Sequence, residues 1–341
     1  MVGALGLASV EALLAALAGE ALGAAIGAYP ALSVAGLVIV AGEAVHLAGG
    51  DRTLTALVGL GPAFGPHVAF AGGVAATAYA ARRGYLDTDF AYHEAKHVTA
   101  ALGTRPDVLL VGAAFGLLGH VLARVSATSG IPVDPVMASI VVSGFVHRIV
   151  LGYPLIGTVR GGLLDMSPFE RGERRAAVDG GTATLDRDDL SDRRYAVEPW
   201  LPHQYEWGGV AVSGLFVGLF AAFLSVRTSS PFLAFGIAAA TLLFLDLEGD
   251  GRVPVTHHMA LPAGLAALGV AGMGTPVALV AGGLFGLLSG VVAELGQRTL
   301  YAHADTHLDP SALGIVVTTG LLGVLSTAGL VQLDLLGALG Y

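Results

Sequence analysis

The sequence predicts an all-α polytopic membrane protein with about 10–11 helical segments, built from two internal repeats. Hydrophobic residues make up 54% of the 341 residues and charged residues only 13%, and the mean hydropathy is +0.73. These values lie outside the range of soluble domains. Apolar runs long enough to cross a hydrocarbon core of about 30 Å recur along the whole chain. Similar apolar stretches also occur twice, which indicates an internal duplication.

The duplication is clearest between PDVLLVGAAFGLLGHVLA, which begins at Pro106, and TPVALVAGGLFGLLSGVVAE, which begins at Thr275. Three matched positions define it: Pro106 with Pro276 at a spacing of 170, Asp134 with Asp309 at 175, and Gly65 with Ser230 at 165. The last spacing also lays His93 on His258. Many transporters are built from duplicated apolar units of this kind, with the binding site between the halves.

Composition divides the chain into five parts. We expect an N-terminal helix within residues 1–30, a first membrane repeat over 31–158, a polar linker over 159–207, a second repeat over 208–332 and a C-terminal tail over 333–341. Gly, Pro and charged residues separate five apolar segments in each repeat. These segments lie near 31–49, 64–81, 92–104, 107–124 and 134–157, and near 208–226, 231–246, 256–271, 276–296 and 310–330. The last segment of each repeat opens with Asp-Pro, at Asp134 and Asp309, where we expect the carboxylate to cap a helix.

The third segment of each repeat decides the symmetry. If all five segments cross, the second repeat is inverted relative to the first, because an odd number of crossings changes sides; this is the arrangement that we favour. In the first repeat, FAYHEAKHVTAALG offers about 14 helical residues, fewer than the roughly 20 that span a bilayer. If residues 92–104 and 256–271 re-enter the membrane without crossing it, the repeats are parallel.

The polar stretch between the repeats is dense in charge, and we expect it to be a solvated linker. It ends in EPWLPHQYEW, and the aromatic residues from Trp200 to Trp207 are typical of an interfacial belt. With five crossings per repeat, 11 arginines including Arg52 lie on the linker side, and four including Arg82 and Arg83 lie on the other. The positive-inside rule then places the linker in the cytoplasm.

The stretch HEAKH, from His93 to His97, matches the H-E-x-x-H zinc motif. On a helix, two histidines four residues apart share a face and can bind one zinc ion, with Glu94 as the general base. A third ligand is required. The repeat argues against this site, because Glu94 and His97 fall on Met259 and Pro262 and only the first histidine has a matching histidine.

A second hypothesis uses the histidines that the repeat pairs. His93 and His258 lie at matched places in the two short segments, where discontinuous helices line the central site of duplicated transporters. With His97 and His257 nearby, four imidazoles could bind a transition metal, relay protons or hydrogen-bond a polar cargo. His93, His97 and His258 are the candidate metal ligands; histidines satisfied at a helix interface are the simpler alternative.

Arg148 is the remaining candidate for the pathway, because an ionisable group in an apolar run is costly and usually has a partner. No carboxylate lies near it in the sequence. It could bind an anionic cargo, but we expect it to extend towards the interface and leave only its stem in lipid.

Several functions are excluded. The chain has no cysteine, and hence no disulfide or thiolate metal site, and its net charge of −9 argues against nucleic acid. It contains no P-loop, dinucleotide fingerprint or G-x-S-x-G motif, so we expect no cofactor and no enzymatic activity.

The sequence therefore predicts a membrane transporter or channel for a small solute or ion, with its pathway between the repeats. A membrane-embedded zinc metalloenzyme that uses HEAKH and a structural or assembly protein remain alternatives, and homo-oligomerisation stays open.

Phrases along most of the chain, such as FGPHVAFAGGVAATAYAARRG, ALGTRPDVLLVGAAFG, HRIVLGYPLIG, LLDMSPFERGE and EPWLPHQY, resemble a family of uncharacterised multi-pass membrane proteins from haloarchaea. The resemblance runs from about Pro30 to the C-terminus. It implies a haloarchaeal cytoplasmic membrane and no known activity, and it assigns no substrate and no catalytic residue.

Overall fold

The computed structural model describes residues 9–86, 90–175, 194–247 and 252–341. These residues form helices and loops without a strand, apart from an isolated bridge between Arg174 and Tyr195. Up to residue 175 the helices are α1 Val10–Ile26, α2 Ala28–Leu47, η2 Thr55–Gly59, η3 Pro66–Phe70, α3 Ala71–Arg82, η4 Glu94–Lys96, α4 Pro106–Ser129, α5 Pro135–Leu151 and α6 Ser167–Glu170. After it come α8 Trp207–Thr228, α9 Phe232–Ala240, α10 Leu242–Leu247, α11 His257–Gly269, η5 Ala271–Met273, α12 Thr275–Gly296, η6 Gln297–Tyr301, α13 Pro310–Thr327 and α14 Leu335–Ala338. The all-α prediction is confirmed.

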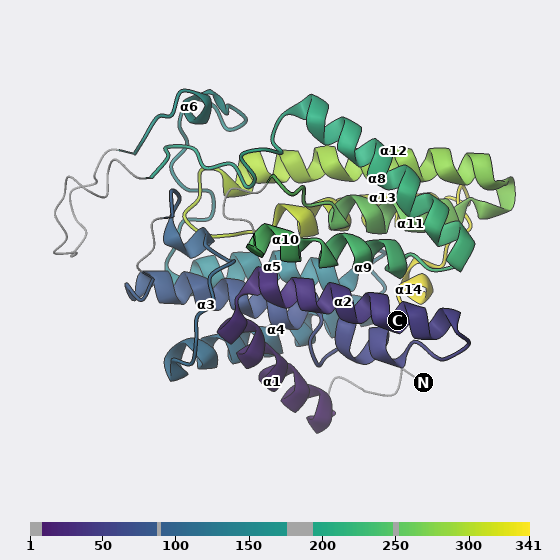
Figure 1. Cartoon of the computed structure of the whole chain (residues 1–341), viewed down its shortest axis with the longest axis horizontal. Coiled ribbons are helices and arrows are strands. Elements are labelled where there is room, and N and C mark those ends of the chain that lie inside the picture. Colours follow the sequence, from purple (N-terminus) through teal and green to yellow (C-terminus); the bar gives the residue numbers. More distant parts are fainter. Residues whose placement is uncertain (1–8, 87–89, 176–193, 248–251) are drawn as a thin grey trace.

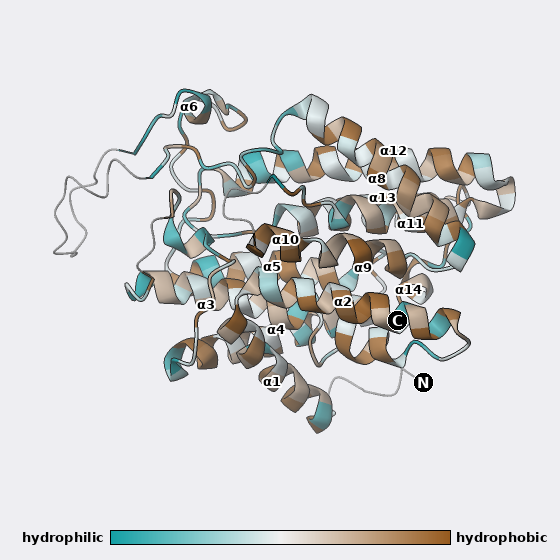
Figure 2. Cartoon of the chain, viewed as in Figure 1, coloured by the Kyte–Doolittle hydropathy of each residue, from teal (hydrophilic) through white to brown (hydrophobic). Residues whose placement is uncertain are grey.

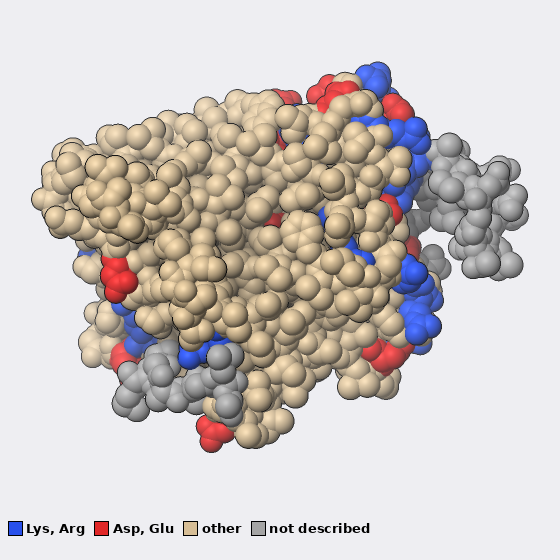
Figure 3. All heavy atoms as spheres, turned by 180° about the vertical axis from the view of Figure 1, so that it is seen from behind, with Lys and Arg blue, Asp and Glu red and all other residues tan. Residues whose placement is uncertain are grey.

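The exterior is consistent with a membrane protein. Five helices are long and apolar enough to cross a membrane: α2, α4, α8, α12 with its extension to Tyr301, and α13. Large apolar side chains such as Leu110, Phe216 and Val324 are exposed on the long helices, which are mostly apolar along their length (Figure 2). On the face seen in Figure 3, charged side chains gather towards the two ends, and the wide belt between them is nearly free of charge. Lipid is therefore the natural surrounding for this belt.

The long helices lie side by side along the longest axis (Figure 1). Residues 152–175 and 194–206 lie at one end, which we call the linker end, and the C-terminus lies at the opposite end. The α2 helix begins at the linker end and, with 20 residues, covers about 30 Å before it reaches the opposite end. Arg52 therefore lies at the opposite end, and Arg82 and Arg83 lie at the linker end, the reverse of their expected sides.

Two groups of helices pack against each other. In the first half α1, α3, α4 and α5 are neighbours, and in the second half α8, α11, α12 and α13 are neighbours. The halves meet where α2 packs on α9 and where α5 packs on α13. Helix α4 starts at the linker end, whereas α12 starts at the opposite end, so these two helices run in opposite directions.

The two third segments differ. Residues 92–104 contain only the three-residue η4 and remain at the linker end, between the end of α3 and the start of α4. Residues 256–271 contain α11, a helix of 13 residues with Pro262 inside it, which leads from the linker end towards the opposite end. The first segment therefore does not cross.

Part of the linker belongs to the packed interior. Ala196, Val197 and Glu198 are all 0% exposed, and the backbone amide of Glu198 donates to the carbonyl of Ala302 at 2.9 Å. The expectation of a fully solvated linker is therefore wrong for residues 194–201, while residues 176–193 lie outside the described part of the chain.

Glycine allows a close helix contact between α8 and α12. A Cβ atom on Gly286 would lie 2.4 Å from the carbonyl oxygen of Gly214, and a Cβ atom on Gly218 would lie 2.4 Å from that of Gly282. Such distances are impossible for real side chains, so the two backbones touch only because these positions lack one. Small residues are the usual means of close helix packing in membranes.

Candidate functional site

The HEAKH stretch is not an α-helix. His93 has extended backbone angles (φ −61°, ψ 131°), and its Nδ1 accepts the amide N–H of Ala95 at 3.1 Å, so the imidazole caps η4. Glu94 begins η4, and His97 follows it with its ring stacked on Phe90 at 4.4 Å. The predicted helical face with two zinc ligands is therefore wrong. No three His, Asp or Glu residues in the described ranges are grouped so that they could hold a metal ion.

The histidines paired by sequence have different surroundings. The ring of His93 makes an edge contact with Tyr153 at 5.8 Å, and its backbone amide donates to Glu198 Oε1 at 3.1 Å. The ring of His258 lies 5.8 Å from that of Trp200. Within residues 9–86, 90–175, 194–247 and 252–341, no hydrogen bond or ring contact joins His93 to His258.

His257 joins His258 to the start of α13. The two rings are 5.9 Å apart, and His257 Nε2 lies 2.9 Å from Ser311 Oγ. The same hydroxyl donates to Asp309, whose carboxylate caps α13 by accepting the amides of Ser311 and Ala312. Asp134 caps α5 in the same way through the amide of Met137 at 2.9 Å. Both predicted caps are thus confirmed.

Arg148 does not extend to the interface. It is 0% exposed, and its Nε donates to Thr306 Oγ1 at 2.9 Å. Its terminal nitrogens donate to the carbonyls of Leu300 at 2.7 Å and Thr306 at 2.9 Å, and to the carbonyl of Leu155. The guanidinium group therefore ties α5 to the turn between α12 and α13, because that turn supplies the acceptors that water would supply outside.

A network of ion pairs joins three distant segments at the linker end. Lys96 Nζ lies 2.7 Å from Glu198 Oε2, and both side chains are 0% exposed. Arg194 lies 2.5 Å from Glu198 and 2.7 Å from Asp305. Arg175 completes the set with a 3.1 Å contact to Asp305. We call these five residues the charge network; it fixes the HEAKH segment and the linker to the turn before α13.

Burial and charge set the protonation states in this network. Burial lowers the pKa of Lys96 to about 8, although Glu198 opposes the shift. Burial alone would raise the pKa of Glu198, but Lys96 and Arg194 hold it below its usual value. Burial lowers the pKa of His93 to about 4, with a further contribution from Arg194. At neutral pH, Lys96 and Glu198 are therefore an ion pair and His93 is neutral.

Lys96 of the charge network lines a cavity of about 460 Å³, which we call the linker-end cavity. Aromatic rings dominate its wall, among them Tyr29, Tyr92, Trp200 and Tyr301. The Lys96 ammonium lies 4.3 Å from the centre of the Tyr301 ring, a cation–π contact. The cavity is large enough for a small organic molecule.

A second cavity, of about 200 Å³, opens at the other end of α2. Its polar wall includes Arg52, Thr55, Arg124 and Asp134, and the stacked rings of His67 and His120, 6.2 Å apart, also line it. We call it the opposite-end cavity. Because α2 separates Tyr29 in one wall from Thr55 in the other, the two cavities lie at different ends of the bundle.

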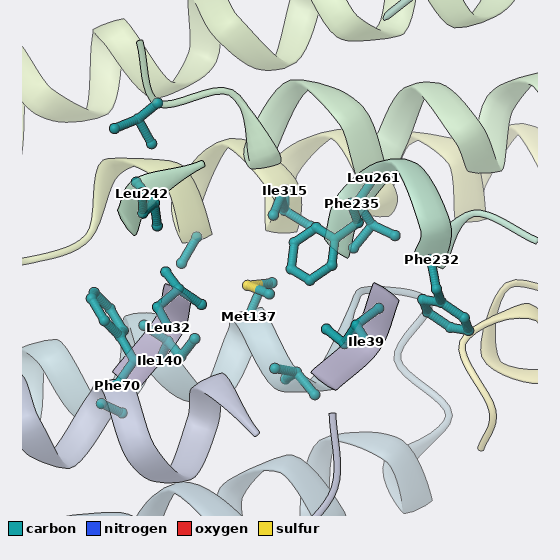
Figure 4. Close-up of a cluster of buried hydrophobic side chains, with 14 of the residues drawn as sticks. Leu32, Ile39, Phe70, Met137, Ile140, Phe232, Phe235, Leu242, Leu261 and Ile315 are labelled. Carbon is teal, nitrogen blue, oxygen red and sulfur yellow. The ribbon is translucent and has the colours of Figure 1, made fainter. Parts of the chain in front are cut away.

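A cluster of buried apolar side chains (Figure 4) shares residues with both cavities. The first half contributes Leu32, Ile39, Phe70, Met137 and Ile140, and the second half contributes Phe235, Leu261 and Ile315. Met137 and Leu261 also line the opposite-end cavity, and Tyr29 and Val98 of the same cluster line the linker-end cavity. The cluster therefore reaches from one cavity to the other.

Sequence reasoning missed the charge network. Lys96 was visible as the single lysine of the chain, placed in an apolar stretch, and such a residue calls for a buried partner. Its partner Glu198 is 102 residues away, so no local pattern could identify it.

Comparison with known proteins gives a family but no activity. No curated protein and no solved structure matches the chain. The model of a family of unknown function, DUF7973, matches residues 2–338. The chain therefore belongs to the DUF7973 family.

Proposed function

We propose that the chain is an integral membrane transporter or channel for a small solute or ion, with its pathway along the interface of the two halves. One observation carries the proposal: a cavity enters from each end, and an apolar cluster built by both halves separates them. A closed pathway requires this arrangement, since each cavity gives access from one side and the cluster prevents a continuous leak.

We infer that the halves are inverted repeats, α1–α5 and α8–α13. The neighbours of α4 in its half correspond to those of α12 in the other half, and these two helices run in opposite directions. Inverted repeats support alternating access, in which one half rocks against the other around a central site. On this assignment α1 belongs to the first repeat, and the HEAKH loop is an insertion.

The linker-end cavity favours a small organic solute as cargo. Lys96 lines its wall with its charge neutralised by Glu198, and its aromatic rings offer apolar faces and hydroxyl groups. Such a mixed lining suits molecules with both polar and apolar parts.

The arginines favour a cytoplasmic linker end. In the described residues, Arg52 follows the end of α2, and Arg124 and Arg227 lie near the ends of α4 and α8; these three helices end at the opposite end (Figure 1). Arg82, Arg83, Arg105 and the described linker arginines all lie at the linker end. By the positive-inside rule, the linker faces the cytoplasm in a cytoplasmic membrane.

Thiol labelling tests the pathway, because the chain has no cysteine of its own. In proteoliposomes, Thr99→Cys should react with an impermeant thiol reagent only from the linker side, and Thr55→Cys only from the opposite side. Labelling of both variants from the same side would contradict the proposal.

Tracer flux tests the activity. With a panel of small amino acids, sugars, carboxylates and inorganic ions, at least one tracer should enter proteoliposomes faster than protein-free liposomes. Met137→Trp should abolish this flux by filling the pathway, whereas Leu110→Trp, at an exterior position that is 70% exposed, should preserve it. Rates equal to those of protein-free liposomes for every tracer would refute transport.

A further inference from the structure

Glu20 is a buried acid in the middle part of α1. Its side chain is 0% exposed, and neither carboxyl oxygen has a hydrogen-bond partner among the residues that the structure describes. The backbone amides of Gly72 and Gly73 face the carboxyl group, but they do not reach it with the length and angle of a hydrogen bond. An ionised carboxylate is very costly in such surroundings.

Two other buried glutamates have arginine and side-chain hydrogen-bond partners, which Glu20 lacks. Glu43 accepts hydrogen bonds from Thr55 at 3.2 Å and Ser230 at 2.5 Å, and it lies 3.4 Å from Arg52. Glu294 lies 2.5 Å from Arg298 and accepts from Gln297 at 3.0 Å. Each of these two carboxyl groups therefore has an arginine and hydrogen-bond donors beside it. Glu20 has no arginine and no side-chain donor beside it, and only the two backbone amides face it.

The neighbouring helices make room for this acid. A Cβ atom on Gly72 would lie 2.2 Å from Glu20 Cδ, and a Cβ atom on Gly116 would lie 2.3 Å from Glu20 Cβ. Helices α3 and α4 thus carry glycine where the side chain of Glu20 packs. The carboxyl group occupies a space that larger residues at these two positions would fill.

The titratable side chains on the elements packed against α1 belong to α2, η3, α3 and α4. Towards the linker end these are Tyr29, Tyr79, Arg82, Arg83 and Asp107. Towards the opposite end they are Glu43, His46, His67, His120 and Arg124. None of these side chains forms an ion pair or a hydrogen bond with Glu20.

We propose that Glu20 is an intramembrane proton-binding site, which carries a proton at neutral pH and releases it only when water reaches the contact of α1 with α3 and α4. One carboxyl group with amide donors beside it does not provide the oxygen ligands that a metal cation needs, so the ligand is a proton. The proposal does not rest on the proposed function, because a neutral acid at this place is independent of any cargo.

Infrared spectroscopy of the full chain in lipid tests the protonation state. The wild-type protein should show a carboxylic-acid C=O band at neutral pH that is missing from Glu20→Gln and present in Glu43→Gln. Gln has nearly the shape of a protonated Glu, so Glu20→Gln should fold, and its thermal unfolding midpoint should stay close to that of the wild type. If the carboxylic-acid band of Glu20→Gln equals that of the wild type, the proposal is overturned.

Dicyclohexylcarbodiimide gives a second readout, since this apolar reagent enters membranes and reacts with protonated carboxyl groups. The acid donates its proton to a carbodiimide nitrogen while its oxygen bonds to the central carbon, and the adduct rearranges to a stable N-acylurea. Peptide mapping should find the adduct on Glu20, and its rate of formation should fall as the pH rises. Labelling of Glu43 or Glu294 in place of Glu20 would contradict the proposal.

Discussion

Removing the charge of Glu198 and removing the charge of Lys96, the two central residues of the charge network, should lower the free energy of unfolding by different amounts. Glu198→Gln leaves the Lys96 ammonium without its partner at 2.7 Å, in a place where the Lys96 side chain is 0% exposed. It also removes one of the two carboxylates that Arg194 contacts. Breaking a buried ion pair from one side costs about 3–5 kcal/mol. We therefore expect Glu198→Gln to lower the free energy of unfolding by this amount.

Lys96→Met should cost less, about 1–3 kcal/mol. After this change Glu198 still lies 2.5 Å from Arg194 and still accepts the amide of His93 at 3.1 Å. The methionine also keeps most of the lysine stem in place. The double variant should cost less than the sum of the single changes, because the unpaired lysine that makes Glu198→Gln costly is no longer present.

Denaturant unfolding in mixed micelles, followed by tryptophan fluorescence, measures these differences. The two tryptophans, Trp200 and Trp207, both lie at the linker end, and Trp200 donates to the Tyr29 hydroxyl at 2.5 Å. Glu173→Gln is the control, because its ion pair with Arg171 is exposed and should have no measurable effect. A Lys96→Met variant as costly as Glu198→Gln, or additive effects in the double variant, would refute this account of the network.

Three further predictions follow from the geometry. Gly286→Ala should destabilise the protein by about 1–3 kcal/mol, because the new Cβ would lie 2.4 Å from the Gly214 carbonyl oxygen. Gly209→Ala is the control and should leave the stability unchanged, because no atom lies within 4 Å of its new Cβ. Equal unfolding midpoints for the two variants would contradict this prediction. Acylation of Lys96 by a small amine-reactive reagent, quantified by peptide mapping, should be half-maximal near pH 8, since the pKa of Lys96 is about 8. A midpoint near pH 10.5 would indicate an ordinary exposed lysine. Stability of the wild-type protein should fall as the pH drops from 6.5 towards 4, because the unfolded chain binds a proton that the folded His93, with a pKa of about 4, does not. His93→Asn, which can still cap η4, should flatten this dependence in unfolding curves, and an unchanged slope would exclude His93 as a cause.

The HEAKH segment shows why a match to the zinc motif did not predict its structure. Spacing alone allows a helix with two zinc ligands, but Ala95 and Lys96 are buried, and Lys96 pairs with Glu198 in the linker. The segment bends around this ion pair, so η4 has only three residues. The surroundings of Arg148 were equally hidden from local patterns, because its acceptors at Leu300 and Thr306 are more than 150 residues away.

The sequence by itself determined the features that depend on composition and on local signals. Apolar runs predicted an all-helical membrane chain, and the Asp-Pro pairs at Asp134 and Asp309 predicted two helix starts, because a cap needs only residues within one turn. The tertiary structure alone decided the partners of Lys96 and Arg148, the burial of Glu20 without a partner, the charge network and the two cavities. These depend on contacts between segments far apart in the chain, whose free energy comes from burial and charge pairing that no local pattern records.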